Sequence, residues 1–83
     1  MIVEDDNDIN KILELIVKDQ GYKATCCFSG TEARLRLQRQ FFDLILLDIM
    51  LPGLTGEELL AEIREQSSVS IIVISAKSMI EVK

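Results

Sequence analysis

Two unbroken apolar runs constrain the fold of this chain more than any other feature of its sequence. The segments FDLILLDI (42–49) and SIIVIS (70–75) have the length of strands and consist mostly of aliphatic residues. Strands that are apolar along their whole length are typical of parallel sheets, because helices cover both faces of such sheets. The two runs therefore predict parallel strands within an α/β fold.

Apolar side chains at helical spacing predict a helix over 8–21. Polar residues that can cap its start precede it, and Gly21 stands where a helix commonly ends. The N-cap candidates are Asp6, Asn7 and Asp8, and the predicted buried face consists of Ile9, Ile12, Leu13, Ile16 and Val17.

The remaining segments continue the alternation of strand and helix. Further strands are predicted over 1–3 and 22–28, further helices over 29–40 and 57–66, and the start of another helix over 76–83. Alternation with short connections predicts parallel strands joined by right-handed crossovers. The chain has 83 residues and shows neither linker nor repeat, so we expect a single domain over 1–83.

Composition narrows the classes of function. The formal net charge of −5 argues against nucleic-acid contact by this segment, and the absence of histidine excludes histidine-based catalysis and histidine metal sites. No apolar run approaches the ~20 residues needed to cross a bilayer, and no signal peptide is visible. Two adjacent cysteines, Cys26 and Cys27, make no disulfide framework. We expect a cytoplasmic chain without membrane contact.

Polar side chains stand at the carboxyl ends of three predicted strands. Glu4 and Asp5 follow the first, Asp48 ends the third and Ser75 ends the fourth. Ligands of open α/β sheets bind at this edge. Taken singly, these residues also fit helix caps or strand terminators. Together they fit a Mg²⁺ site, because clustered carboxylates repel one another without a cation, and a carboxylate can also act as a nucleophile towards phosphorus.

Three motifs, IVEDD, DLILLDIMLPGLTG and IIVISAK, resemble the receiver domain of bacterial two-component response regulators over essentially the whole chain. The resemblance implies a flavodoxin-like (CheY-like) doubly wound sheet in the order 2-1-3-4, with the fifth βα unit missing. The LPG turn and the SAK segment look most like receivers joined to a winged-helix DNA-binding domain. Regulation of transcription by the full-length protein is therefore implied.

The resemblance also implies roles for individual residues. Asp48 would accept a phosphoryl group from a histidine kinase, with Mg²⁺ as cofactor, and Ser75 would be the switch hydroxyl. Mg²⁺ would be held by Asp5 directly, by Glu4 largely through water, by Asp48 and by the backbone carbonyl of Met50. Met50 and Lys77 fall at positions that tune the lifetime of the phosphoryl group, while Pro52, Gly53 and Gly56 shape the loop after the acceptor. Such a domain is not an enzyme; at most it phosphorylates or dephosphorylates itself on Asp48.

The chain departs from the family pattern after the fourth strand. The fifth strand and its phosphoryl-contacting lysine are not present, and no effector domain follows, so we expect a truncated receiver with weak phosphorylation. The fourth strand would then be an apolar edge, which predicts self-association as a dimer or larger oligomer. The main alternative is a non-catalytic, oligomerising interaction module. A carboxylate-nucleophile phosphatase is disfavoured, because that class usually carries Asp-x-Asp after its first strand.

Overall fold

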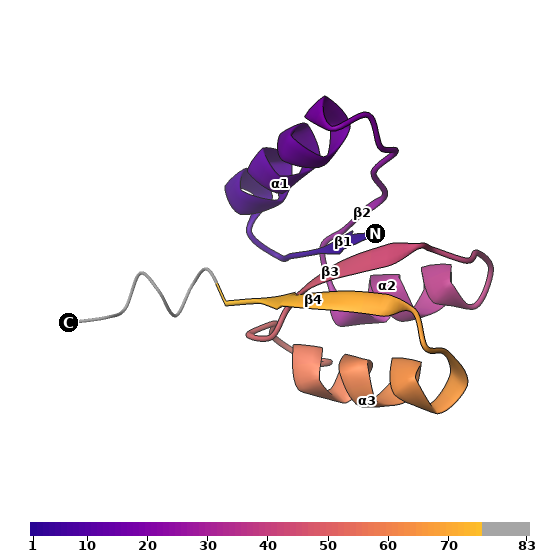
Figure 1. The fold of residues 1–83 in the computed structure, drawn as a ribbon. Coiled ribbons are helices and arrows are strands. Elements are labelled where there is room, and N and C mark those ends of the chain that lie inside the picture. The colour runs from indigo at the N-terminus through magenta and orange to yellow at the C-terminus, as the bar shows by residue number, and fades with distance from the viewer. Residues whose placement is uncertain (76–83) are drawn as a thin grey trace.

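The computed structural model describes residues 1–75 and shows a parallel sheet with helices on both faces (Figure 1). The elements in chain order are β1 (Ile2–Val3), α1 (Asn7–Asp19), β2 (Cys26–Cys27), α2 (Gly30–Leu37), β3 (Leu44–Asp48), α3 (Gly56–Gln66) and β4 (Ser70–Ile74). The four strands run in the order β2-β1-β3-β4. The predicted α/β class and the strand order 2-1-3-4 are therefore confirmed.

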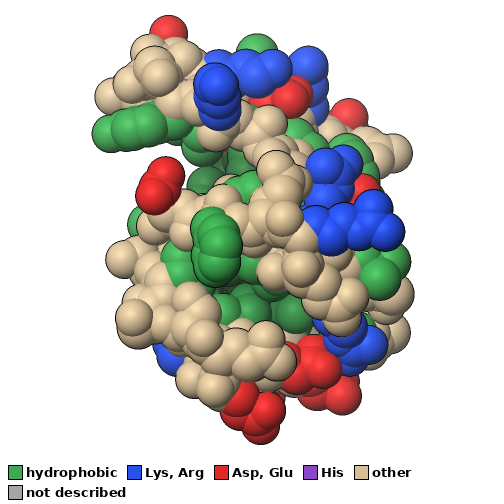
Figure 2. Space-filling view, turned by 90° about the vertical axis from the view of Figure 1, so that its right-hand side faces the viewer, with side chains coloured by type: hydrophobic (Ala, Val, Ile, Leu, Met, Phe, Trp, Pro, Cys, Tyr) green, Lys and Arg blue, Asp and Glu red, His purple; other side chains and the backbone are tan. Residues whose placement is uncertain are grey.

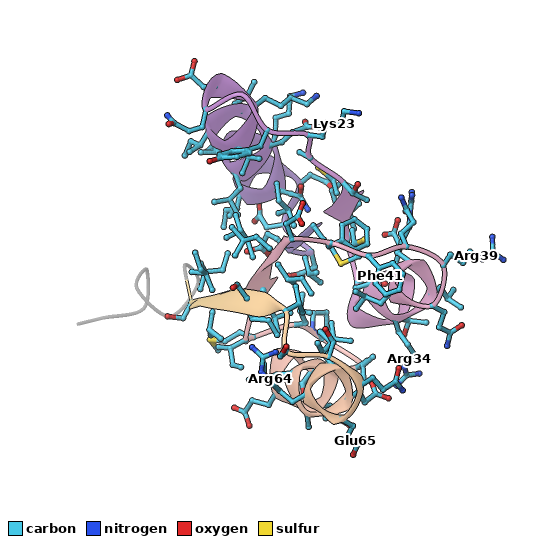
Figure 3. All side chains as sticks on the ribbon, turned by 45° about the vertical axis from the view of Figure 1, so that its right-hand side comes forward. Lys23, Arg34, Arg39, Phe41, Arg64 and Glu65 are labelled. Carbon is cyan, nitrogen blue, oxygen red and sulfur yellow. The ribbon has the colours of Figure 1, made fainter. Side chains whose placement is uncertain are left out.

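The helices divide unequally between the two faces of the sheet. In Figure 1, α1 lies above the sheet, and α2 and α3 lie below it. Side chains that alternate along β3, Ile45 and Leu47, are fully buried against Leu59 of α3 and Ala33 of α2. An ion pair of 2.9 Å between Arg34 and Glu62 joins α2 to α3, and Figure 3 shows Arg34 on the side of α2 that faces α3. The main core therefore lies between the sheet and these two helices.

Local side-chain caps explain where the helices begin. Asp6 accepts a hydrogen bond from the backbone N–H of Ile9, and Ser29 accepts one from Glu32, both at 3.0 Å. Thr55 and Glu58 cap each other's backbone at the start of α3, an arrangement that the sequence interpretation missed. The three helices are thus anchored at the ends that face the carboxyl edge of the sheet.

Several predicted elements are shorter in the structure. The strand predicted over 22–28 is only Cys26–Cys27, because β1, its one neighbour among the described strands, offers only two residues for pairing. The helix predicted over 29–40 ends at Leu37. The segment 76–83, in which we predicted the start of a helix, and with it Lys77, lies outside the described residues.

The predicted burial was wrong on one side of the sheet. Ile12 and Ile16 of α1 were predicted to be buried, yet they are 56% and 55% exposed, and Ile72 of β4 is 50% exposed. Unbroken apolar strands had indicated that both faces are covered. Within residues 1–75, however, α1 is the only helix on this face, so no second helix packs against its Ile12 and Ile16 or covers Ile72.

A cavity of about 820 Å³ opens between the C-terminal end of α1 and the amino ends of the strands. Its apolar lining includes Met1, Ile2, Val17, Leu44 and Leu46. Figure 2 looks onto this end of the molecule and shows hydrophobic side chains in the hollow beneath α1.

Among the described residues, no helix has both the length and the apolar character that a membrane span requires.

Candidate functional site

The sheet topology places two acidic residues side by side. β1 and β3 are parallel neighbours, and Val3 pairs with Leu47. The residue after each of these is an acid: Glu4 directly follows β1, and Asp48 is the last residue of β3. Asp5 follows at once in the loop that leads to α1. The carboxyl edge of the sheet therefore gathers three carboxylates from two strands.

The three carboxylates form a compact cluster. One oxygen from each of Glu4, Asp5 and Asp48 lies within 4.8 Å of the others. Glu4 and Asp48 are 0% exposed, while Asp5 is half-buried and reaches solvent. Burying like charges together is unfavourable unless a cation or a proton compensates them. The donor set, three hard oxygen ligands with one side open to water, fits Mg²⁺.

Backbone N–H groups orient two of the carboxylates. The N–H of Met50 donates to Oδ1 of Asp48, and the N–H of Asp6 donates to Oε2 of Glu4, each at 3.0 Å. Hydrogen bonds to ionised groups are the stronger kind in proteins and favour the charged form. Both loops that leave the sheet therefore help to fix the acids they follow.

The start of α3 packs directly against the backbone of Asp48. A Cβ atom at Gly56 would overlap the carbonyl oxygen of Asp48 and the Cα atom of Ile49. Gly53, in the same loop, has a φ of 68°, which a side chain would disfavour, although the space around it is open. The two glycines therefore serve different needs: Gly53 allows the turn, and Gly56 allows the close approach.

The other predicted site residues lie near the cluster to different degrees. Ser75 is half-buried and directly follows Ile74, the β4 residue that pairs with Asp48. The backbone N–H of Ile49 donates to the carbonyl of Ile74 at 3.0 Å, which holds the two strand ends together. Met50 is 44% exposed in the loop after β3. The structure thus brings Ser75 and Met50 to the edge that holds the acids.

The sequence interpretation missed a buried amide beside the acids. Asn10 of α1 is 1% exposed, and its side chain donates hydrogen bonds to the backbone of Glu4 and of Cys27. A signal was present in the sequence, because Asn10, Leu13 and Val17 follow the i, i+3, i+7 spacing of one helix face. A polar residue on that inner face must find partners in the fold.

Both cysteines are free thiols, and burial raises the pKa of Cys27 to about 11. Only the thiolate reacts readily, so Cys27 is expected to resist alkylation by iodoacetamide at pH 8 in the folded chain. Cys26 is partly exposed and is expected to react first. Mass spectrometry of digests taken over time checks this order, and equal rates at the two thiols under native conditions would contradict it.

Comparison with known proteins gives a family match over the whole chain. The model of the response regulator receiver domain matches residues 1–83. YcbL of Bacillus subtilis, an uncharacterized transcriptional regulatory protein, is 40% identical over 77 residues, which are 93% of this chain and 34% of that protein. The response regulator ArlR of Staphylococcus aureus is 37% identical over 78 residues, which are 94% of this chain and 36% of that protein. The chain therefore spans about a third of the length of these curated relatives.

Solved structures agree with this match. The response regulator TrrA of Thermotoga maritima, solved in complex with Mg²⁺-BeF, superposes with a TM-score of 0.87 at 32% identity, covering 94% of this chain and 69% of that one. TrrA in a second structure, a complex with the histidine kinase ThkA, gives a TM-score of 0.84 at 32% identity, covering 90% and 66%. Sequence and fold comparisons thus point to the same class of domain.

Proposed function

This chain belongs to the response regulator receiver domain family, and on that premise we propose that Asp48 is its phosphoacceptor. The observation that carries the proposal is the burial of Asp48 at a strand end, within 4.8 Å of two further carboxylates. In the proposed reaction, an oxygen of Asp48 attacks the phosphorus of a phosphohistidine on a kinase. A P–O bond forms, the P–N bond breaks, and the leaving imidazole takes a proton from water on the nitrogen that held the phosphorus.

We assign the metal site to the acid cluster. Asp5 is the carboxylate that reaches solvent, so it suits direct contact with a hydrated Mg²⁺, while buried Glu4 suits contact through water. Asp48 and the backbone carbonyl of Met50 complete the proposed protein ligands. When bound, Mg²⁺ neutralises negative charge on the transferring phosphoryl group. The Mg²⁺-BeF complex of TrrA supports this assignment.

The remaining roles follow the same proposal. Ser75 lies one residue beyond the strand partner of Asp48 and is proposed as the switch hydroxyl. Met50 and Lys77 are proposed to tune the lifetime of the phosphoryl group.

The partner is a histidine kinase, as the complex of TrrA with ThkA supports, and the chain is a phosphoacceptor rather than an enzyme with an external substrate. The free thiols fit a cytoplasmic location, and the name of YcbL, a transcriptional regulatory protein, supports a role in transcription in a longer protein.

Beryllofluoride with Mg²⁺ tests the site directly, because BeF₃⁻ bound to a carboxylate oxygen stands in for an aspartyl phosphate. We expect the mixture to raise the thermal midpoint of the unmodified chain, since a ligand that binds only the native state stabilises it. Neither component alone should match that shift, and D48N should lose it. An equal shift in D48N would contradict the assignment of Asp48.

We further propose that the chain self-associates through the outer edge of β4. Among the described strands, β4 pairs only with β3, so no strand within residues 1–75 covers its other edge. The strand Ser70–Ile74 carries no charge, and Ile72 and Val73 are 50% and 46% exposed. Long apolar edges without charge invite pairing with another chain. A stable assembly that is never phosphorylated would favour the alternative function, a non-catalytic interaction module.

Ile72→Lys tests this edge. A lysine at the centre of β4 places a charge where a second strand would pair, so the variant is expected to be monomeric at concentrations where the unmodified chain associates. Sedimentation velocity over a concentration series measures the difference. Leu35→Lys is the matched control, because Leu35 is 57% exposed and belongs to α2 rather than to β4. A monomeric unmodified chain, or association that Ile72→Lys leaves unchanged, would contradict the proposal.

A further inference from the structure

Asn10 is the only buried residue of α1. It lies on the helix face that packs against the sheet, and its side chain is 1% exposed. A buried amide is costly unless its donors find acceptors, so its partners indicate what the residue does in the fold. Both partners of its Nδ2 group are backbone carbonyls at the ends of neighbouring strands.

Asn10 extends the β1–β2 pairing beyond the strands themselves. Each of these strands has only two residues. At the carboxyl end of β2, the carbonyl of Cys27 accepts the N–H of Glu4 at 3.0 Å and Nδ2 of Asn10 at 3.1 Å. The same Nδ2 donates to the carbonyl of Glu4 at 2.9 Å. A side chain thus supplies hydrogen bonds at the point where the sheet ladder stops.

These contacts fix the peptide between two of the clustered acids. The carbonyl of Glu4 belongs to the peptide unit that joins Glu4 to Asp5, and a peptide unit is planar. A hydrogen bond to that oxygen therefore fixes the orientation of the peptide plane that leads into Asp5. Two further hydrogen bonds hold the loop between β1 and α1. The N–H of Asp6 donates to Oε2 of Glu4, and the carbonyl of Asp6 accepts the N–H of Asn10 at 2.9 Å.

We propose that Asn10 is a positioning residue for the metal site, which holds the Glu4–Asp5 peptide so that both carboxylates face Asp48. This inference rests on the proposed function of the acid cluster. The amide is specific for the role, since two carbonyl oxygens require a group with two N–H donors. An aspartate would present only oxygens to those carbonyls, and a leucine of similar size would present no donor.

Metal affinity separates this role from a merely structural one. Mn²⁺, followed by its electron paramagnetic resonance signal, is the probe for the divalent site. Groups that orient metal ligands typically contribute 10–100-fold to metal affinity, so Asn10→Leu should raise the Kd for Mn²⁺ about 10-fold or more. Leu13→Ala is the control, because Leu13 lies one turn further along the inner face of α1 and carries no polar group. Its Kd should stay within about twofold of the unmodified value.

The measurement is made at a temperature where circular dichroism shows each chain to be folded. If Asn10→Leu does not fold, Asn10→Ala takes its place with the same expectations. Unchanged Mn²⁺ affinity in the Asn10 variant, or an equal loss in Leu13→Ala, would overturn the inference and leave the proposed function standing. Failure of the unmodified chain to bind Mn²⁺ would overturn both.

Discussion

Replacing Gly56 with alanine is expected to lower the free energy of unfolding by about 3 kcal/mol, at the upper end of typical overpacking costs. The added Cβ would overlap backbone atoms of Asp48 and Ile49, and backbone yields less readily than a side chain. A domain of this size is stable by only about 5–10 kcal/mol, so the loss is a large share of the total. Because the helix must move away from Asp48, the acid cluster should be disturbed as well.

Urea denaturation followed by circular dichroism measures the effect. Gly53→Ala is the matched control in the same loop, because its added Cβ meets no atom within 4 Å and suffers only from the φ of 68°. We expect that variant to lose about 1 kcal/mol. A loss at Gly56 no greater than the loss at Gly53 would show that the close approach of α3 to the acceptor strand is not required.

The second large effect concerns the charge of Asp48 itself. Asp48→Asn removes one of three carboxylates that lie within 4.8 Å of one another, two of them fully buried. At this separation, each like-charge pair costs about 3 kcal/mol at the effective dielectric constant that suits protein sites. Part of that cost is already relieved by hydrogen bonds, so we expect the metal-free variant to be more stable by about 2 kcal/mol.

Calorimetry without Mg²⁺ and with about 10 mM Mg²⁺, a concentration suited to weak sites, separates the effect of charge on stability from the effect of metal binding. The unmodified chain should gain stability from Mg²⁺, whereas D48N should be more stable without metal and gain little from it. Asp43→Asn is the control, since Asp43 is an exposed acid at the opposite end of β3. A destabilised D48N, or one that responds to Mg²⁺ as fully as the unmodified chain, would contradict the repulsion argument.

The sequence predicted the strands and the meeting of the acids correctly, because the local hydrophobic pattern and the sheet topology agree there. The apolar runs around Ile45 and Ile72 predicted parallel strands, and the family resemblance predicted their order. Strand-end positions then indicated that Glu4 and Asp48 would meet. These features follow from the chain itself, because the register of β1 against β3 carries the residue after each strand to the same edge.

Burial was harder to predict, because it depends on what packs against an element. Ile12 and Ile16 have the spacing of a buried face, yet the described elements leave them exposed. Conversely, Asn10 resembles a surface residue in the sequence but is buried, because two carbonyls at strand ends supply its partners. Only the three-dimensional structure places those carbonyls beneath the helix.

The central claim, that Asp48 accepts a phosphoryl group at this acid cluster, is tested most directly by intact mass. The folded chain is incubated with a small-molecule phosphodonor such as acetyl phosphate, with and without Mg²⁺, beside the D48N variant. We expect the mass of one phosphoryl group to be added to the unmodified chain in the presence of Mg²⁺, and to neither control. Absence of any addition to a folded chain, or addition that persists in D48N, would contradict the assignment.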